Sequence, residues 1–168
     1  MTTSQRAGDT VAGVDKRGAA GQTGTSPATR LPSIASFVLA LIGVALSAYL
    51  TFEHFTGSTT LACSATGVVD CLKVTTSPWS VIAGVPVAVA GLAFFLGMTV
   101  LCLPIRAVEG MHTARIVACV VGLVMVLWLV YVEIFEVGAI CLWCTAVHVV
   151  TLLLFGAVLW WREADRTG

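Results

Sequence analysis

Four of the six cysteines in this 168-residue chain form two closely spaced pairs. Cys141 and Cys144 make a C-x-x-C motif, and seven residues separate Cys63 from Cys71. Two electrons pass between such pairs when a thiolate of one attacks a disulfide of the other. The two pairs therefore predict a thiol–disulfide relay. For Cys63 and Cys71 taken alone, a static structural disulfide is an equally good interpretation.

The C-x-x-C motif stands at the start of a long apolar run, where we expect a helix to begin. Unpaired N–H groups and the positive end of the helix dipole stabilise a thiolate there, which makes it a better leaving group in exchange. In a regular helix the two Cβ atoms would lie about 5 to 6 Å apart, which is wider than a disulfide needs. The pair should therefore close in a distorted first turn.

His148 follows Cys144 by four residues and Cys141 by seven, so all three share a helix face with Thr151. An ionisable side chain inside an apolar span is a candidate for function because its burial is costly without a partner. A neutral imidazole could donate a hydrogen bond to a carbonyl oxygen of a ligand. The alternative is a packing histidine bonded to nearby backbone.

A metal site is the competing interpretation of the same cluster. Cys141, Cys144, His148 and a loop cysteine are soft ligands that could hold zinc or copper(I). We favour disulfide chemistry and expect no metal, because thiolates on an oxidising face tend to be lost to disulfides. The remaining two cysteines, Cys102 and Cys119, are expected to be small buried hydrophobic residues.

The composition predicts an integral membrane protein. Hydrophobic residues make up 58% of the chain and charged residues 11%, against about 25% charged residues in a soluble domain. Nine basic and nine acidic residues cancel, so nothing suggests a surface for nucleic acid. Four apolar runs of about 20 residues match a hydrocarbon core of roughly 30 Å. They cover residues 33–52, 81–103, 116–134 and 140–161.

The basic residues predict the orientation, since Lys and Arg beside short loops stay in the cytoplasm. With four spans, Lys73 alone faces outward, and the other eight lie inside: Arg6, Lys16, Arg17, Arg30, Arg106, Arg115, Arg162 and Arg166. Both termini should then be cytoplasmic, and the loop Glu53–Ser80 and the turn Phe135–Ala139 should face the periplasm. We expect a disordered cytoplasmic tail at 1–32, a membrane domain at 33–161 and a cytoplasmic tail at 162–168.

From Ser33 to Trp161 the chain resembles the vitamin K epoxide reductase family, especially bacterial members that reoxidise periplasmic disulfide-forming proteins. The resemblance rests on the two cysteine pairs with their spacing, on Ser77 six residues after Cys71, and on Gly84-Val85-Pro86 at the start of the second span. It implies an all-α bundle of four transmembrane helices that encloses a quinone pocket, capped by the loop between the first two helices.

The resemblance also implies roles for the residues. Cys63 would meet the partner protein, Cys71 would transfer to Cys141, and Cys144 would face a quinone of the menaquinone or ubiquinone type. Ser77 matches a serine near the site. His148 stands where many relatives have a tyrosine that hydrogen-bonds the quinone. Ser80 is the nearest position to an asparagine donor of the animal enzymes, which has no clear counterpart here.

The partner implied by the resemblance is a thioredoxin-fold protein that forms disulfides. Many bacterial relatives carry such a domain fused to the membrane domain. This chain ends at Gly168, so we expect a separate partner and a stand-alone enzyme in the plasma membrane. A quinone reductase of the disulfide bond protein B type also has four helices and two cysteine pairs, but its pairs occur in the reverse order along the chain.

Overall fold

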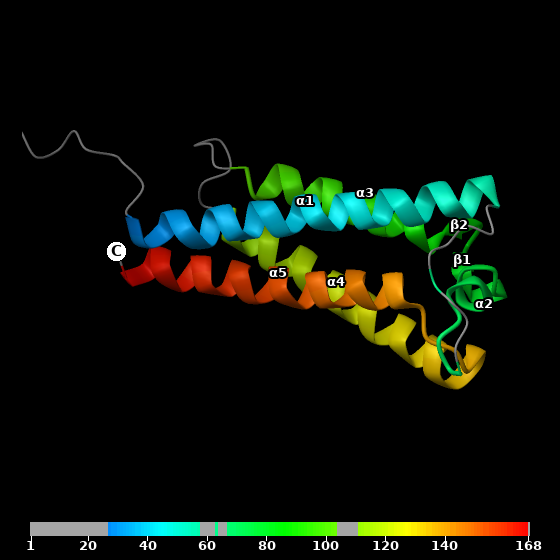
Figure 1. Ribbon diagram of the computed structural model, residues 1–168. Helices are drawn as coiled ribbons and strands as arrows, with labels where there is room; N and C mark the ends of the chain where they lie inside the picture. Colours follow the sequence, from blue (N-terminus) through cyan, green and yellow to red (C-terminus); the bar gives the residue numbers. More distant parts are fainter. Residues whose placement is uncertain (1–26, 58–62, 64–66, 104–110, 168) are drawn as a thin grey trace, which may run out of the picture.

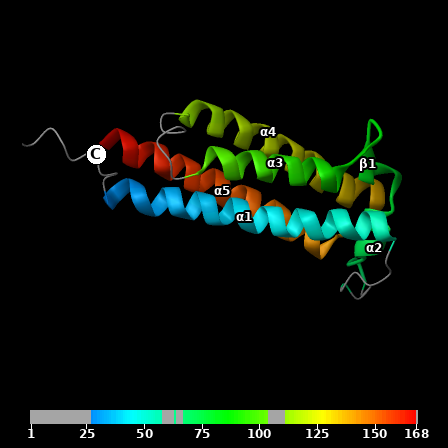
Figure 2. The ribbon, with the colours of Figure 1, turned by 90° about the horizontal axis from the view of Figure 1, so that it is seen from above.

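A computed structural model of the protein describes residues 27–57, 63, 67–103 and 111–167, so most of the predicted N-terminal tail lies outside the described residues. Its long helices lie side by side (Figures 1 and 2). They are α1 (Pro27–Thr56), α3 (Val87–Leu101), α4 (His112–Tyr131) and α5 (Leu142–Thr167). The start of α1 and the end of α5 lie at the same end of the bundle (Figure 1).

Three stretches of the described helices are long and apolar enough to cross a membrane: Thr29–Thr56, His112–Val137 and Leu142–Thr167. Each can satisfy its own backbone N–H and C=O groups in hydrocarbon. The helix α3 is equally apolar but has only 15 residues. The prediction of an apolar, membrane-spanning helical protein therefore agrees with the fold, while α3 is shorter than a usual span.

The first and last helices of the chain, α1 and α5, are longer than predicted. The helix α1 begins at Pro27, inside the expected tail of residues 1–32, and α5 continues to Thr167 through the expected tail of residues 162–168. An apolar run marks the length that matches the bilayer, whereas backbone hydrogen bonds continue into polar sequence wherever the helix can propagate. The described parts of both expected tails are thus helical.

The predicted helix over residues 81–103 is wrong in its first turns. Those residues form a small antiparallel hairpin of β1 (Val81–Ile82) and β2 (Val85–Pro86). Gly84 lies in the turn at φ 81°, a backbone conformation that favours glycine. Pro86 has no N–H to give and stands at the N-cap of α3, which explains why the helix starts only after it.

The third apolar run is also displaced. The helix α4 begins at His112 rather than at Ile116, and at its other end it passes into the π-helix η3 (Val132–Val137). Gly138 ends η3 with a left-handed conformation at φ 63°. The expected outward turn Phe135–Ala139 is therefore helical for most of its length.

The apolar core lies towards the end where α1 begins. Phe95 and Met98 of α3 and Leu154 and Val158 of α5 are fully buried there. Gly43 allows the ring of Phe95 to lie directly against α1, at a place where a Cβ atom would collide with it. The helix α1 packs against both α3 and α5, and α4 packs mainly against α5. Cys102 and Cys119 are buried in this core, which agrees with their interpretation as small hydrophobic residues.

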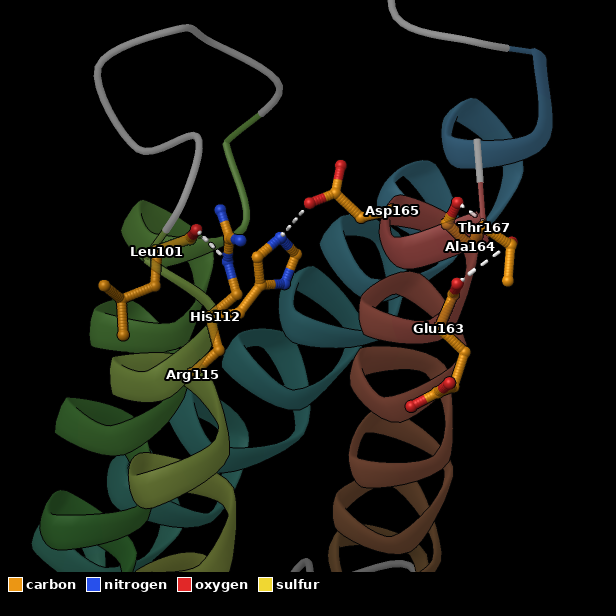
Figure 3. Close-up of polar contacts among 7 residues, drawn as sticks. All are labelled: Leu101, His112, Arg115, Glu163, Ala164, Asp165 and Thr167. Carbon is orange, nitrogen blue, oxygen red and sulfur yellow. Dashed lines mark hydrogen bonds and ion pairs between the residues drawn. The ribbon is translucent and has the colours of Figure 1, made fainter.

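A buried arginine closes this end of the bundle (Figure 3). The Arg115 side chain is 0% exposed, its Nε donates to the Leu101 carbonyl at 2.8 Å, and its guanidinium lies 3.9 Å from the ring centroid of Trp161. His112 Nε2 and Asp165 Oδ2 are 3.3 Å apart beside it. We call this end of the bundle, which contains Arg115, Trp161, His112 and Asp165, the closed end. Arg115 was expected to flank a loop, so its burial is a finding that charge counting could not give.

Candidate redox site

The other end of the bundle brings the two cysteine pairs together, and we call it the cysteine end. A parallel β-bridge joins Val69 to Ile140. The Ile140 N–H donates to the Val68 carbonyl at 2.9 Å, and the Asp70 N–H donates to the Ile140 carbonyl at 3.1 Å. These bonds hold the segment before Cys71 against the segment before α5. They therefore bring together two cysteine pairs that are far apart in the sequence.

Asp70 also fixes the direction in which Cys71 enters the short helix α2 (Cys71–Thr75). Its carboxylate accepts the Lys73 N–H at 3.0 Å, a normal N-cap arrangement. The helix α2 therefore begins at Cys71 itself.

Two sulfur atoms cap the N-terminus of α5. The helix begins at Leu142 rather than at the predicted residue 140, so Cys141 takes the N-cap position, and its carbonyl accepts the Thr145 N–H at 2.9 Å. Its sulfur accepts the Cys144 N–H at 3.2 Å, and the sulfur of Cys71 accepts the Leu142 N–H at 3.2 Å. The unpaired donors of a helix start thus point at the sulfurs that a relay would use.

These bonds favour a thiolate at Cys141, which precedes the first residue of α5. The hydrogen bond from the Cys144 thiol, with help from the backbone N–H of Cys144, holds the pKa of Cys141 below its usual value, although burial acts in the opposite direction. A thiolate is the species that attacks in exchange. Of the two C-x-x-C sulfurs, Cys141 is therefore the better nucleophile towards Cys71.

The two pairs differ in oxidation state. Cys63 and Cys71 are joined by a disulfide, whereas Cys141 and Cys144 are free thiols. Cys71 and Cys141 are both fully buried, while Cys63 is half-buried. The sulfur of the first pair that lies closest to α5 is thus shielded from solvent, and its bonded partner is the accessible one.

A cavity of about 660 Å³ opens beneath the cysteine end, between α1, α3, α4 and α5. Its wall is mainly apolar, with Phe94, Phe95, Met125, Val126, Trp128 and Leu129 among the larger side chains. This volume lies within the range of small-molecule sites, about 300 to 1,000 Å³. Cys144 is part of the wall, whereas Cys141 is not, so the two cysteines of the motif face different surroundings.

The other predicted site residues lie on the same wall. Cys144, His148 and Thr151 follow one another at helical spacing and all line the cavity, with His148 only 6% exposed. Ser77 lines it from the loop, where its hydroxyl donates to the Val74 carbonyl at 2.8 Å, and Ser80 lies beside it. The structure thus places His148 and Ser77 with Cys144 and brings Cys71 next to Cys141.

One polar residue on this wall was not foreseen. Glu133 of η3 is 6% exposed and lines the cavity. Its carboxylate accepts a hydrogen bond from the Cys141 backbone N–H and lies within hydrogen-bond reach of the Cys144 side chain. It falls inside the third apolar run, where an acidic residue is as unusual as His148 is in the fourth. The same rule that selected His148 would have found it.

The metal interpretation finds no support. Within the part of the chain that the structure describes, no three side chains of His, Cys, Asp or Glu are arranged to hold a metal ion.

Comparison with known proteins agrees with the resemblance seen in the sequence. A family model described as the vitamin K epoxide reductase family matches residues 34–159, which is 126 of the 168 residues. A search of curated proteins finds no match.

Proposed function

The chain belongs to the vitamin K epoxide reductase family, a family of membrane oxidoreductases, and from this premise we propose that it carries electrons from protein thiols to a membrane quinone. The electrons enter at the loop pair, Cys63 and Cys71, and leave from the helix pair, Cys141 and Cys144. The observation that carries this proposal is the division of the helix pair. Cys141 lies beside the sulfur of Cys71, and Cys144 lines a large apolar cavity.

The relay begins with a partner thiolate that attacks Cys63, so that Cys71 leaves as a thiolate. Cys71 then attacks Cys141 of an oxidised helix pair and releases the Cys144 thiolate. A second partner thiolate frees Cys63, which attacks Cys71 and releases Cys141. The partner is now oxidised, the loop disulfide has re-formed, and the helix pair is a dithiol.

The accessibility of the loop pair supports the order of attack. Cys63 is half-buried, whereas Cys71 is fully buried against the start of α5. An incoming protein thiolate therefore reaches Cys63 more easily. We propose a separate thioredoxin-fold protein as the electron donor, because the exposed cysteine of a C-x-x-C motif in such a protein is a nucleophile of the required kind.

The cavity fits a quinone in size and chemistry. Its apolar wall suits a planar ring with a hydrocarbon tail, and its few polar groups could orient ring oxygens. His148 and Ser77 are the residues proposed to hold it, by hydrogen bonds from the imidazole and the hydroxyl. When bound, a quinone of the menaquinone or ubiquinone type supplies an acceptor for two electrons and two protons. Cys144 is the only cysteine on the wall among the described residues.

We also propose that α3 is a fourth membrane span. Its 15 residues cover about 22 Å at 1.5 Å per residue, which is short of a core of roughly 30 Å. The hairpin before it, whose residues Val81, Ile82 and Val85 are exposed and apolar, can complete the crossing. Four spans put both termini in the cytoplasm and the cysteine end on the periplasmic side of the plasma membrane, with membrane lipid around the helices.

Quinone reduction by the purified full chain tests the proposal. We expect a reduced thioredoxin-fold protein to drive reduction of a menaquinone or ubiquinone analogue, followed by absorbance, with loss of free thiols in the donor. The matched control is Cys102→Ala, which removes a cysteine of the apolar core and should leave the rate unchanged. A wild-type rate equal to that without protein, for both quinone types and several donors, would refute the function.

A further inference from the structure

Two acidic residues of η3 have opposite surroundings. Glu136 is exposed, whereas Glu133 is buried at 6% exposure and borders the cavity. A buried carboxylate is costly unless hydrogen bonds or a positive charge compensate for lost hydration. No lysine or arginine of the described residues lines the cavity. The groups that compensate Glu133 therefore come from the redox site itself.

The backbone holds Glu133 in register with the helix pair. The Gly138 and Ala139 N–H groups both donate to the Glu133 carbonyl, the second at 3.1 Å. Ala139 is separated from Cys141 by one residue, so the position of Glu133 is tied to the start of α5. A π-turn often occurs at a functional site, because it rotates side chains out of regular helical register.

The Glu133 carboxylate lies within hydrogen-bond reach of a reacting group. It accepts from the Cys141 backbone N–H, and it borders the cavity beside Cys144, whose single thiol proton can be donated either to Glu133 or to the Cys141 sulfur. A thiol must lose its proton before its sulfur can transfer electrons. The acceptor for that proton has to be within hydrogen-bond reach. Glu133 meets this requirement and also contacts the space where protons are consumed.

We propose that Glu133 is a catalytic residue that takes the proton of the Cys144 thiol and returns it to the quinone side of the reaction. This inference rests on the proposed quinone reductase function. The carboxylate and the thiol become a carboxylic acid and a thiolate, so the pair keeps one negative charge throughout. With Cys141 already a thiolate, oxidation of the helix pair releases two electrons and the Cys144 proton, whereas reduction of a quinone to a quinol consumes two protons, so the second proton comes from water. Glu133 carries the Cys144 proton across the cavity wall.

Other ionisable groups surround the pair and must be separated from it in any test. They are Cys141 and His148 at α5, Glu53 and His54 at the end of α1, Lys73 on α2, Tyr131 at the end of α4 and Glu136 on η3. Among these groups, the Cys141 sulfur is the hydrogen-bond partner of the Cys144 side chain. A Cys141→Ala background removes that partner and leaves Glu133 as the one in question.

The test is the pH profile of Cys144 alkylation by iodoacetamide in the full chain, without quinone and in the Cys141→Ala background. Two groups that share one proton titrate in two macroscopic steps. With Glu133 present we expect the rate to rise, reach a plateau and rise again at alkaline pH. With Glu133→Gln the plateau should vanish and the rate should climb in one step, exceeding that of the parent protein at alkaline pH because repulsion from the carboxylate is gone.

Glu133→Gln should raise the alkylation rate at alkaline pH but lower the rate of quinone turnover, which is measured with Cys141 restored. Glu133→Gln should lower it about 100-fold, the usual loss of a general acid–base group, even though the thiolate is more abundant at alkaline pH. Glu133→Asp should recover the plateau and part of the turnover, and Glu136→Gln should match the parent protein in both measurements. The aspartate variant also guards against a glutamine variant that fails to fold.

Superimposable alkylation profiles for Glu133→Gln and its parent would overturn the proton-acceptor role. So would unchanged turnover in Glu133→Gln. Failure of the function itself gives a different result, because the wild-type chain would then reduce no quinone while the two-step alkylation profile would still be present.

Discussion

At the closed end Arg115 is fully enclosed, and at the cysteine end Glu133 is almost as well hidden, yet the surroundings of the two charges differ. The guanidinium stacks on Trp161 and binds the Leu101 carbonyl within a filled core. The carboxylate borders an open cavity and lies beside the thiol of Cys144. A buried charge with fixed partners joins helices together, whereas one beside a cavity and an exchangeable proton is suited to chemistry.

The difference predicts how each end responds to substitution. Changes at the closed end should lower stability and leave the thiols reactive. Changes at the cysteine end should stop electron transfer with little effect on unfolding. Six substitutions test this separation.

The largest effect is expected from Cys144→Ser. Quinone reduction should be lost, at least about 1,000-fold, because the only cysteine of the described cavity wall is gone. The thiolate of Cys141 lies beside Cys71 and can still attack it, displacing Cys63. Without Cys144 the C-x-x-C disulfide cannot form, so only the reverse attack by Cys63 can break the new bond. Mass spectrometry without reductant should find a Cys71–Cys141 crosslink. A protein with only the Cys63–Cys71 bond, and Cys141 free after exposure to reduced partner, would contradict the relay.

Cys63→Ala should separate the two halves of the relay. The partner protein should no longer be oxidised, with at least about a 100-fold loss, because the accessible sulfur of the loop pair is missing. A small dithiol that reaches the helix pair directly should still support quinone reduction. If this variant is as inactive with the small dithiol as Cys144→Ser, then Cys63 does more than receive electrons. If it keeps full activity with the partner, the loop disulfide is structural.

At the closed end the largest loss of stability is expected from Arg115→Ala. The change removes the stacking on Trp161 and the bond to the Leu101 carbonyl and leaves a void, which should cost about 2 to 4 kcal/mol of unfolding free energy. Thermal unfolding in detergent measures it. Cys144 alkylation in the folded variant should remain at the wild-type rate. A large change in that rate would mean that the two ends are coupled.

Gly43→Ala and Gly97→Ala form a matched pair that tests packing near this end. A Cβ atom at Gly43 would collide with the ring of Phe95, which is buried in the core, so we expect a loss of about 1 to 3 kcal/mol. Gly97 is exposed, with nothing within 4 Å of the added atom, so its variant should gain up to about 1 kcal/mol from helix propensity. Equal melting temperatures for the two variants would contradict this account of the core.

The sequence predicted the apolar helices well, because they depend on a local pattern. The redox role of the two cysteine pairs, which also comes from a local pattern, stays a prediction. Neither the apolar runs nor the spacing of the cysteines depends on the residue at which a helix begins or ends. The hairpin before α3 was missed, since Val81, Ile82 and Val85 are as hydrophobic as the helix that follows. Only Gly84 and Pro86 carry a signal for it, and the family resemblance places both at the start of the second span.

The sequence analysis named the four cysteines of the candidate site, but it identified the buried charged residues incompletely. His148 was selected because it interrupts an apolar run, while Glu133 escaped notice near the end of another. Arg115 was counted with the residues that flank membranes, a rule that uses position along the chain and cannot detect a side chain turned inward onto Trp161. Such contacts depend on how helices pack, which single-helix patterns do not encode.

The smallest effect is expected from Asp165→Asn at the closed end. His112 Nε2 lies 3.3 Å from Asp165 Oδ2, but the side chain of Asp165 is 56% exposed, so water and salt screen the pair. We expect a change in unfolding free energy below about 1 kcal/mol, and smaller still at high salt. Arg115 and Trp161 keep their contact in this variant and continue to close the bundle. A loss as large as that of Arg115→Ala would show that the contact between His112 and Asp165, rather than the buried arginine, joins α4 to α5.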